Sequence, residues 1–386
     1  MHRTVHTFVL ALVSAAVAAG TAVVTAGTAA ASSGPSPVVG HLYVDDNTAP
    51  SNTIAAFNRH ADGSLTPIPG SPFATGGGGT GAAIGSQGAL QSSSDGRYLL
   101  AVDAGSHQVS VLRIHGDGSL TLQDVAGSGG TEPVSIAVHD HLVYVANAGA
   151  GGSDYAGFLL SRGGQLSSLA GSTITLPDDA QPGDVLFNSD GTTLVGTRVN
   201  TSQIDSFHVG RNGRLTAAPG SPSAAQGVGP FGSEFRPTNP SQLFVSNAHG
   251  GPNAGTVSAF DVGADGTLSS IGASPFADKQ TAPCWVEISH DGRYLFTVNT
   301  ASSSISRYRI SDDGALRLIG STVFSDPSGL GPEDARLSPD GASLWVADTG
   351  ADKVSGFRVI GGHLREFASS PTAGPAGAAP FGVVVN

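Results

Sequence analysis

The stretch Pro283–Gly320, PCWVEISHDGRYLFTVNTASSSISRYRISDDGALRLIG, contains the unit from which the rest of the chain is built. It predicts four short strands, because β-branched and aromatic residues alternate in each segment and Asp, Gly, Asn or Ser fill each break. The pairs Asp291-Gly292 and Asp313-Gly314 indicate hairpin turns, since glycine adopts the positive φ that tight turns need. One sheet of this size cannot bury its faces alone, so it needs neighbours of the same kind.

The third strand of this unit and its turn recur along the whole chain. The copies lie at residues 54–66, 109–121, 156–167, 204–216, 257–269, 305–317 and 354–366. The turn glycines Gly213, Gly266, Gly314 and Gly362 are 53, 48 and 48 residues apart. Four strands in a repeat of about 50 residues are typical of one blade of a β-propeller.

The two ends of the chain indicate how the ring closes. Complete units open with a proline-led strand, such as Pro230-FGSEF, whereas the first unit begins at His41 directly with its second strand. The missing strand stands at the other end, where Pro380-FGVVVN is similar to Pro230-FGSEF. The sequence therefore predicts an all-β, seven-bladed β-propeller with four antiparallel strands per blade, in which the C-terminal strand closes the first blade.

Residues 1–31 are expected to be a secretory signal peptide. Arg3 precedes the apolar run FVLALVSAAVAAG, and Ala29-Ala30-Ala31 forms a small-residue cleavage site. The alternative is a retained membrane anchor, although the run is short and rich in alanine, and no other stretch has about 18 continuous apolar residues. We expect residues 32–39 to be a flexible mature N-terminus and residues 40–386 to be a single propeller. The protein is thus expected to be secreted, with no membrane span after processing.

The composition argues against several kinds of partner. The formal charge is −12, and Lys279 and Lys353 are the only lysines, so binding to nucleic acid is not expected. A single cysteine, Cys284, excludes an internal disulfide. A monomer is expected, because a closed ring leaves no sheet edge for pairing.

Motifs that carry common catalytic or metal chemistry are absent from the sequence. It has no G-x-S-x-G elbow, no H-E-x-x-H helix and no Cys/His metal spacing, and its Asp-Gly pairs lack the trailing carboxylate of a calcium loop. We therefore expect no metal and no cofactor. Gly76–Gly79 is not followed by the Lys-Ser/Thr of a phosphate-binding loop, which favours a flexible connection between blades.

The proline-led strands supply the candidate site, because the first strand of each blade lines the channel of a propeller. When these strands are aligned on their prolines, the residues two and four positions later share one face, since strand side chains alternate. Three consecutive blades carry ionisable residues at the fourth position: Glu234, Glu287 and Arg336. One layer away lie Asp184, Trp285 and Asp334. Two carboxylates beside one arginine can poise one of them as a general acid or base, and the alternative is a hydrogen-bonded polar ring around channel water.

The ends of the second strands add two candidates. Asn and Asp predominate there because a turn follows, so Arg198 and His249 stand out from the pattern. Arg198 is a candidate for binding a ligand, and His249 is a candidate auxiliary group in catalysis.

The repeats resemble those of the seven-bladed lactonase family, which includes propeller-type 6-phosphogluconolactonases and the fungal 3-carboxymuconate lactonising enzyme. The resemblance rests on S-x-DGRYL, on the I/V-S-x-x-R-I strand and on the DGSLT turn, and it extends from about residue 40 to residue 386. It implies an active site of a His, a Glu and arginines at the channel mouth. The positions that match this set carry other residues here: Val134, Phe231, Ala248 and Thr300. The candidates for a relocated set are Glu333, Asp334 and His249.

Two functions remain open. The first is a secreted lactonase-type hydrolase acting on a sugar or related lactone in the channel mouth. In it Glu234 or Glu287 would direct water, and Arg198 or Arg336 would bind the carboxylate or polarise the carbonyl. The second is a non-catalytic secreted propeller that binds a small ligand, a glycan or a protein on its loop face. Equal rates of lactone opening by the protein and by a Glu287→Gln, Arg336→Ala variant would exclude the channel cluster.

Overall fold

The computed structural model describes residues 36–327, 331–375 and 377–386. The expected signal peptide therefore lies outside the described residues. Residues 37–386 form one compact unit. Among the residues that the structure describes, no helix has the length and hydropathy that crossing a bilayer requires.

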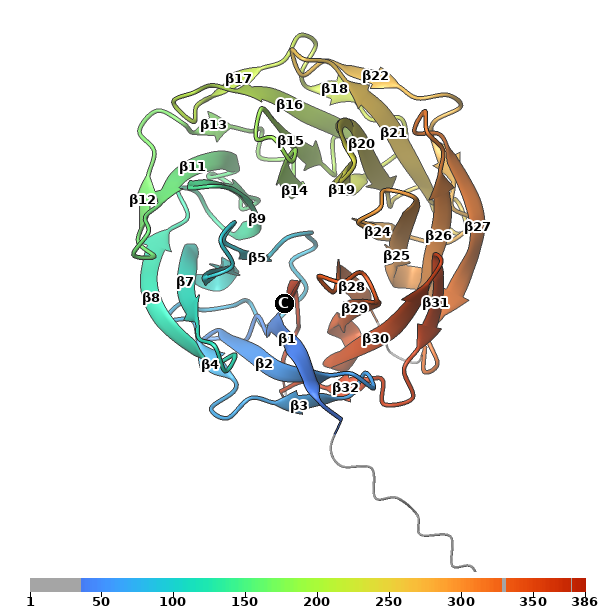
Figure 1. Ribbon diagram of the computed structural model, residues 1–386. Helices are drawn as coiled ribbons and strands as arrows, with labels where there is room; N and C mark the ends of the chain where they lie inside the picture. Colours follow the sequence, from blue (N-terminus) through green and yellow to red (C-terminus); the bar gives the residue numbers. More distant parts are fainter. Residues whose placement is uncertain (1–35, 328–330, 376) are drawn as a thin grey trace, which may run out of the picture. The chain divides into compact units, whose positions relative to one another are not determined.

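The unit is an all-β ring of seven sheets, each built on four antiparallel strands, as predicted (Figure 1). The strands follow sequence order from the channel outwards, except in blade 1, where the last strand of the chain is innermost. The innermost strands of blades 1 to 7 are β33 (Val383–Val385), β5 (Leu90–Ser92), β9 (Pro133–His139), β14 (Pro182–Phe187), β19 (Pro230–Arg236), β24 (Pro283–Ile288) and β28 (Pro332–Leu337). The second strands are β1 (Val38–Asp45), β6 (Tyr98–Asp103), β10 (Leu142–Asn147), β15 (Thr193–Arg198), β20 (Asn239–Asn247), β25 (Tyr294–Asn299) and β29 (Ser343–Asp348).

The outer half of each blade is built from the third and fourth strands. The third strands are β2 (Thr53–His60), β7 (Gln108–Ile114), β11 (Asp154–Leu160), β16 (Gln203–Val209), β21 (Thr256–Val262), β26 (Ser304–Ile310) and β30 (Lys353–Ile360). The fourth strands are β3 (Leu65–Pro67), β8 (Leu120–Gly127), β12 (Leu166–Ser168), β17 (Leu215–Ala217), β22 (Leu268–Ser270), β27 (Leu316–Val323) and β31 (His363–Glu366). Short additional strands pair with the third strands of several blades: β4 (Phe73–Ala74), β13 (Ile174–Thr175), β18 (Ser223–Ala224), β23 (Phe276–Ala277) and β32 (Thr372–Ala373). Three 3-10 turns follow second strands: η1 (Ala104–Ser106), η2 (Thr300–Ser302) and η3 (Thr349–Ala351).

The ring closes as the sequence predicts, through the C-terminal strand. β33 pairs antiparallel with β1, with Tyr43 opposite Val384, so the two ends of the propeller share blade 1. The first strand starts earlier than expected, because β1 begins at Val38, which pairs with His60 across an irregularity that ends at Gly40. The paired part of the fold therefore includes the last two residues of the segment expected to be flexible.

Hydrogen bonds between blades use the predicted hairpin turns. Gly213 has φ 75° in the outer turn of blade 4, and its carbonyl accepts a hydrogen bond of 2.8 Å from the Tyr144 hydroxyl of blade 3. The Tyr43 hydroxyl makes the equivalent 3.0 Å bond from blade 1 to Gly118 of blade 2. These turns thus do more than reverse the chain, because they also satisfy a buried tyrosine of the preceding blade.

Close packing explains why residues 76–79 are all glycine. A Cβ at Gly77 would overlap the carboxyl of Asp103, and a Cβ at Gly79 would overlap the backbone of Asn47. Asp103 and Asn47 are both buried between blades 1 and 2. The run is therefore a closely packed connection between these blades, because only glycine leaves room for the neighbouring groups.

Candidate functional site

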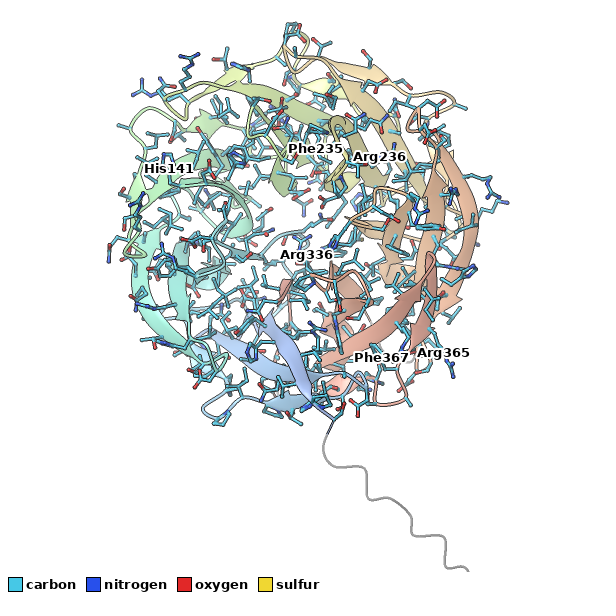
Figure 2. All side chains as sticks on the ribbon, viewed as in Figure 1. His141, Phe235, Arg236, Arg336, Arg365 and Phe367 are labelled. Atoms are coloured by element: carbon cyan, nitrogen blue, oxygen red, sulfur yellow. The ribbon has the colours of Figure 1, made fainter. Side chains whose placement is uncertain are left out.

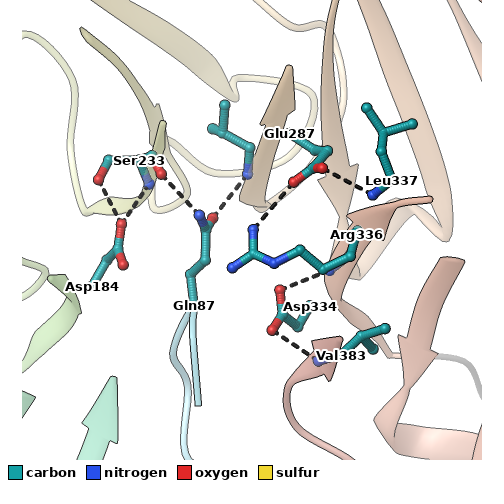
Figure 3. Close-up of polar contacts among 10 residues, drawn as sticks. Gln87, Asp184, Ser233, Glu287, Asp334, Arg336, Leu337 and Val383 are labelled. Atoms are coloured by element: carbon teal, nitrogen blue, oxygen red, sulfur yellow. Dashed lines mark hydrogen bonds and ion pairs between the residues drawn. The ribbon is translucent and has the colours of Figure 1, made fainter. Parts of the chain in front are cut away.

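A group of ionisable side chains from blades 4 to 7 gathers on the inner strands: Asp184, Glu234, Glu287, Asp334 and Arg336. Nη1 of Arg336 lies 3.2 Å from Oε2 of Glu287, and the Leu337 backbone N–H donates a 2.9 Å bond to Glu287 Oε1 (Figure 3). Arg336 is near the centre of the ring in Figure 2. Glu234 interacts electrostatically with both Glu287 and Arg336, so the structure brings these three residues together.

Glu234 is the one carboxyl of this group that accepts no hydrogen bond from any described residue. Burial, followed by the nearby Glu287 carboxylate, raises the pKa of Glu234 to about 8, although Arg336 acts in the opposite direction. The Glu234 carboxyl is therefore mostly protonated at neutral pH. The cluster therefore places the Glu234 carboxyl, with its raised pKa, close to the ion pair of Glu287 and Arg336.

The two aspartates lie one layer nearer the beginning of the inner strands. Burial raises the pKa of Asp184 to about 7, against hydrogen bonds from the Ser233 hydroxyl at 2.5 Å and backbone N–H at 2.8 Å. Burial raises the pKa of Asp334 to about 6, against the attraction of Arg336 and a 3.2 Å bond from the Val383 N–H. In both cases the acceptor belongs to one blade and the backbone donor to the next, so these carboxyls connect neighbouring blades.

The channel is closed at one end by residues 82–88, which we call the channel plug. They precede β5 and form the loop of blade 2 that extends towards the centre of the ring in Figure 1. Gln87 carries the contacts of the plug: its backbone N–H donates to Gly183 at 2.9 Å, its Nε2 donates to the Ser233 carbonyl at 2.8 Å, and its Oε1 accepts from the Val286 N–H at 3.0 Å. One side chain of blade 2 thus reaches blades 5 and 6 across the channel (Figure 3).

Exposure indicates which end of the channel is open. We call the end at which the inner strands begin the start face, and the end at which they turn into the second strands the turn face. Asp184, Trp285 and Asp334, next to the plug, are 0–2% exposed, whereas the side chain of Arg336 is 19% exposed and that of Glu287 is 11% exposed. The layer next to the plug is therefore more deeply buried than Arg336 and Glu287, which lie nearer the turn face.

Trp285 belongs to the sealed layer. Its ring lies 5.5 Å from that of Phe231 and 6.4 Å from that of Phe381, measured between centroids. Its indole Nε1 is buried without a hydrogen-bond partner among the described residues. Trp285, a candidate from the aligned inner strands, thus packs between Phe231 and Phe381 in the layer under the plug.

The remaining predicted site residues are not in the pocket. Arg198 makes a bidentate pair with Asp205 of its own blade, with two N–O distances of 2.6 Å. His249 is exposed at the start face, beside Gly229. Glu333 is buried at the same face, and burial holds its pKa well above the ordinary value. Its Oε2 has no hydrogen-bond partner among the described residues.

Sequence reasoning missed Gln87, Ser135 and Ser233. The signal for Gln87 was present, because the second repeat has GSQG where other repeats have a proline-led strand. Ser135 donates a 3.3 Å bond to Asp184, and a serine in a strand carries no sequence signal for that contact. Among the described residues, no group of three or more His, Cys, Asp or Glu side chains is arranged to hold a metal ion.

Gly232→Ala tests the contacts of the plug. A Cβ at this position would overlap Gln87 Oε1 and lie 2.6 Å from the Cys284 carbonyl, so we expect a loss of about 2 kcal/mol in the free energy of unfolding. Urea denaturation measures this loss, and hydrogen exchange measures the freed Val286 N–H. Gly127→Ala is the control, because a Cβ there meets no atom within 4 Å. Equal stability and exchange in the two variants would contradict the proposed packing of Gln87.

Seven blades around a plugged channel, with a cluster of four carboxyls and one arginine on the inner strands, define a seven-bladed β-propeller with an ionisable cluster in its channel. Residues 192–380 match the family model described as a lactonase with a seven-bladed β-propeller. This match, which covers just under half of the chain, and the fold together support a seven-bladed β-propeller of the lactonase family.

Individual relatives agree with this assignment. Over 123 residues the chain is 32% identical to a 6-phosphogluconolactonase of Cronobacter sakazakii, a match that spans 32% of this chain and only 35% of that protein. A putative 6-phosphogluconolactonase from Bacteroides uniformis superposes with a TM-score of 0.71 at 21% identity, over 90% of this chain and 98% of the other. The periplasmic gluconolactonase PpgL of Pseudomonas aeruginosa gives a TM-score of 0.70 at 18% identity, with the same coverage. At these identities the two solved structures show the fold.

Proposed function

We propose that this propeller hydrolyses a lactone in the channel pocket, which substrate reaches from the turn face. The observation that carries the proposal is the Glu234 carboxyl, without a hydrogen-bond partner among the described residues, beside the ion pair of Glu287 and Arg336. The family match and the names of the similar proteins support the reaction class.

The pocket contains the groups that lactone hydrolysis needs. Glu287 accepts a proton from water as the water oxygen attacks the acyl carbon, and Arg336 stabilises the oxyanion that develops on the carbonyl oxygen. Glu234 donates its proton to the ring oxygen as the acyl–oxygen bond breaks, which yields the hydroxy acid. The proton gained by Glu287 returns to Glu234 or to water before the next turnover. Glu234 therefore acts as the general acid, a role that requires its raised pKa.

Glu234→Gln tests this assignment. We expect the rate of D-glucono-1,5-lactone opening, measured in a pH-stat above the spontaneous rate, to fall by about 10²–10³-fold, because the amide has no proton to donate. Asp265→Asn, the same change in an exposed outer turn, is the control and should keep the full rate. A Glu234→Gln variant with the parent rate would exclude this mechanism.

The pH dependence follows from the raised pKa of Glu234. The acid form is the active one, so kcat/KM should decline as the pH rises through about 8. The same carboxyl lowers stability as the pH rises from its unfolded pKa to about 8, because the folded state retains a proton that the unfolded state releases. Glu234→Gln should remove this part of the pH dependence of the urea midpoint. A midpoint with an unchanged pH profile in the variant would contradict the raised pKa.

A non-catalytic role is favoured by one observation, the network of hydrogen bonds that joins Ser135, Asp184, Ser233 and Gln87. Such a network serves structure alone. It does not include Glu234, which is why the rate of the Glu234→Gln variant distinguishes the two functions.

A further inference from the structure

The open end of the channel is bordered by aspartates. They occupy the turns between the first and second strands of blades 2, 3, 4, 6 and 7: Asp95, Asp140, Asp190, Asp291 and Asp340. Arg97 and Arg293 neutralise those of blades 2 and 6 in exposed pairs of 2.6 Å. Within the described part of the chain, no Lys or Arg forms a salt bridge with the aspartates of blades 3, 4 and 7. Arg236 ends the inner strand of blade 5 at this face, so these turns carry five aspartates against the three arginines Arg97, Arg236 and Arg293. The net negative charge of the rim repels an approaching anion.

Carboxylates offset the positive charge in the pocket. Its one guanidinium, that of Arg336, is bonded to Glu287 and attracted by Asp334. The inward backbone N–H groups are occupied as well, since Leu337 donates to Glu287 and Val383 donates to Asp334. A phosphate group needs several cationic or N–H donors, whereas the described residues of this cluster supply one guanidinium among the four carboxyls of Asp184, Glu234, Glu287 and Asp334.

We infer that the pocket selects a lactone that carries no phosphate or other anionic group, an inference that rests on the proposed lactone hydrolysis. The chain thus differs in substrate class from the 6-phosphogluconolactonases to which it is similar. Selection arises from repulsion at the rim and from the missing phosphate partner, so it acts on binding as well as on rate.

Binding of stable analogues tests the inference independently of catalysis. D-gluconolactam, an uncharged analogue of the lactone, and its 6-phosphate are titrated into the full-length protein by calorimetry. We expect the phosphorylated compound to bind at least about tenfold more weakly, and this ratio to decrease at 0.5 M NaCl as the rim is screened. Equal or tighter binding of the phosphate would overturn the inference, and so would failure of both compounds to bind. Selective binding without hydrolysis of D-glucono-1,5-lactone would leave the inference standing and refute the proposed function.

A gain of function gives a second measurement. Leu186 of blade 4 is partly exposed and occupies the same level of its inner strand as Glu234 does in blade 5. Leu186→Lys supplies the missing cation and should improve the affinity for the 6-phosphate about tenfold, while Leu186→Gln, similar in length and neutral, should not. If Lys and Gln variants bind the 6-phosphate equally, charge does not decide the selection and the inference is wrong.

Discussion

Removal of the last strand, by deletion of residues 380–386, is expected to abolish the cooperative unfolding of the whole ring. The deleted segment buries Phe381, Val383 and Val384 and pairs with β1, so blade 1 would lose its inner strand. Burial of three such side chains contributes about 6 kcal/mol, which is of the order of the total stability of a folded domain. Deletion would also remove the Val383 N–H from buried Asp334. We expect an insoluble product, or a soluble one without a sigmoidal urea transition.

A circular permutant separates the loss of the strand from the change of terminus. The His41 N–H and the Asn386 carbonyl are 3.0 Å apart, so a short linker can join the two ends of the propeller. New ends placed in the exposed outer turn at Arg211 and Asn212 should leave the urea midpoint close to that of the parent chain. Cooperative unfolding of the truncated chain, at a midpoint near that of the permutant, would show that closure through β33 is dispensable.

The fold was predictable because its determinants are local and repeated. Asp-Gly turns and proline-led strands recur along the chain. Blade 1 lacks its first strand at the N-terminal side, and Pro380-FGVVVN at the C-terminus supplies it. In blade 2, the plug replaces the proline-led start of the inner strand, so the repeat does not predict it. Its contacts are between Gln87 and backbone groups of Ser233 and Val286, and a backbone partner leaves no trace in the sequence.

The candidate site was predictable in part for the same reason. Alignment of the inner strands placed Glu234, Glu287 and Arg336 at one level. The structure brings them together because equivalent positions of neighbouring blades lie side by side around the channel. It does not bring Arg198 to them, since Asp205, seven residues later, captures that guanidinium. Other second-strand ends show the same spacing, as in the 2.7 Å bond from Asn147 to Asp154. Arg198 thus differs in type from the Asn and Asp at the other second-strand ends, yet it makes the same kind of contact, with a carboxylate seven residues later.

Arg336→Met is expected to lower the free energy of unfolding by about 3 kcal/mol at pH 8, because it leaves partly or fully buried carboxylates without their cation. Arg336 opposes the rise in the pKa values of Glu234 and Asp334, so its loss should raise both pKa values further. A carboxyl whose pKa is raised in the folded state makes the folded protein more stable in acid than in base, because the folded state retains a proton that the unfolded state releases. The stability defect of the variant should therefore be smaller at pH 5 than at pH 8.

Arg97→Met provides the matched control for this prediction. Arg97 also pairs with a carboxylate, that of Asp95 at 2.6 Å, but both side chains are 50% exposed. Water and salt screen such a pair, so its loss should cost less than about 1 kcal/mol, with little difference between pH 5 and pH 8. Urea midpoints of both variants at both pH values measure the contrast. If Arg336→Met matched Arg97→Met at pH 8, the stability of the buried carboxylates would not depend on Arg336, and its ion pair with Glu287 would contribute no more than the exposed pair.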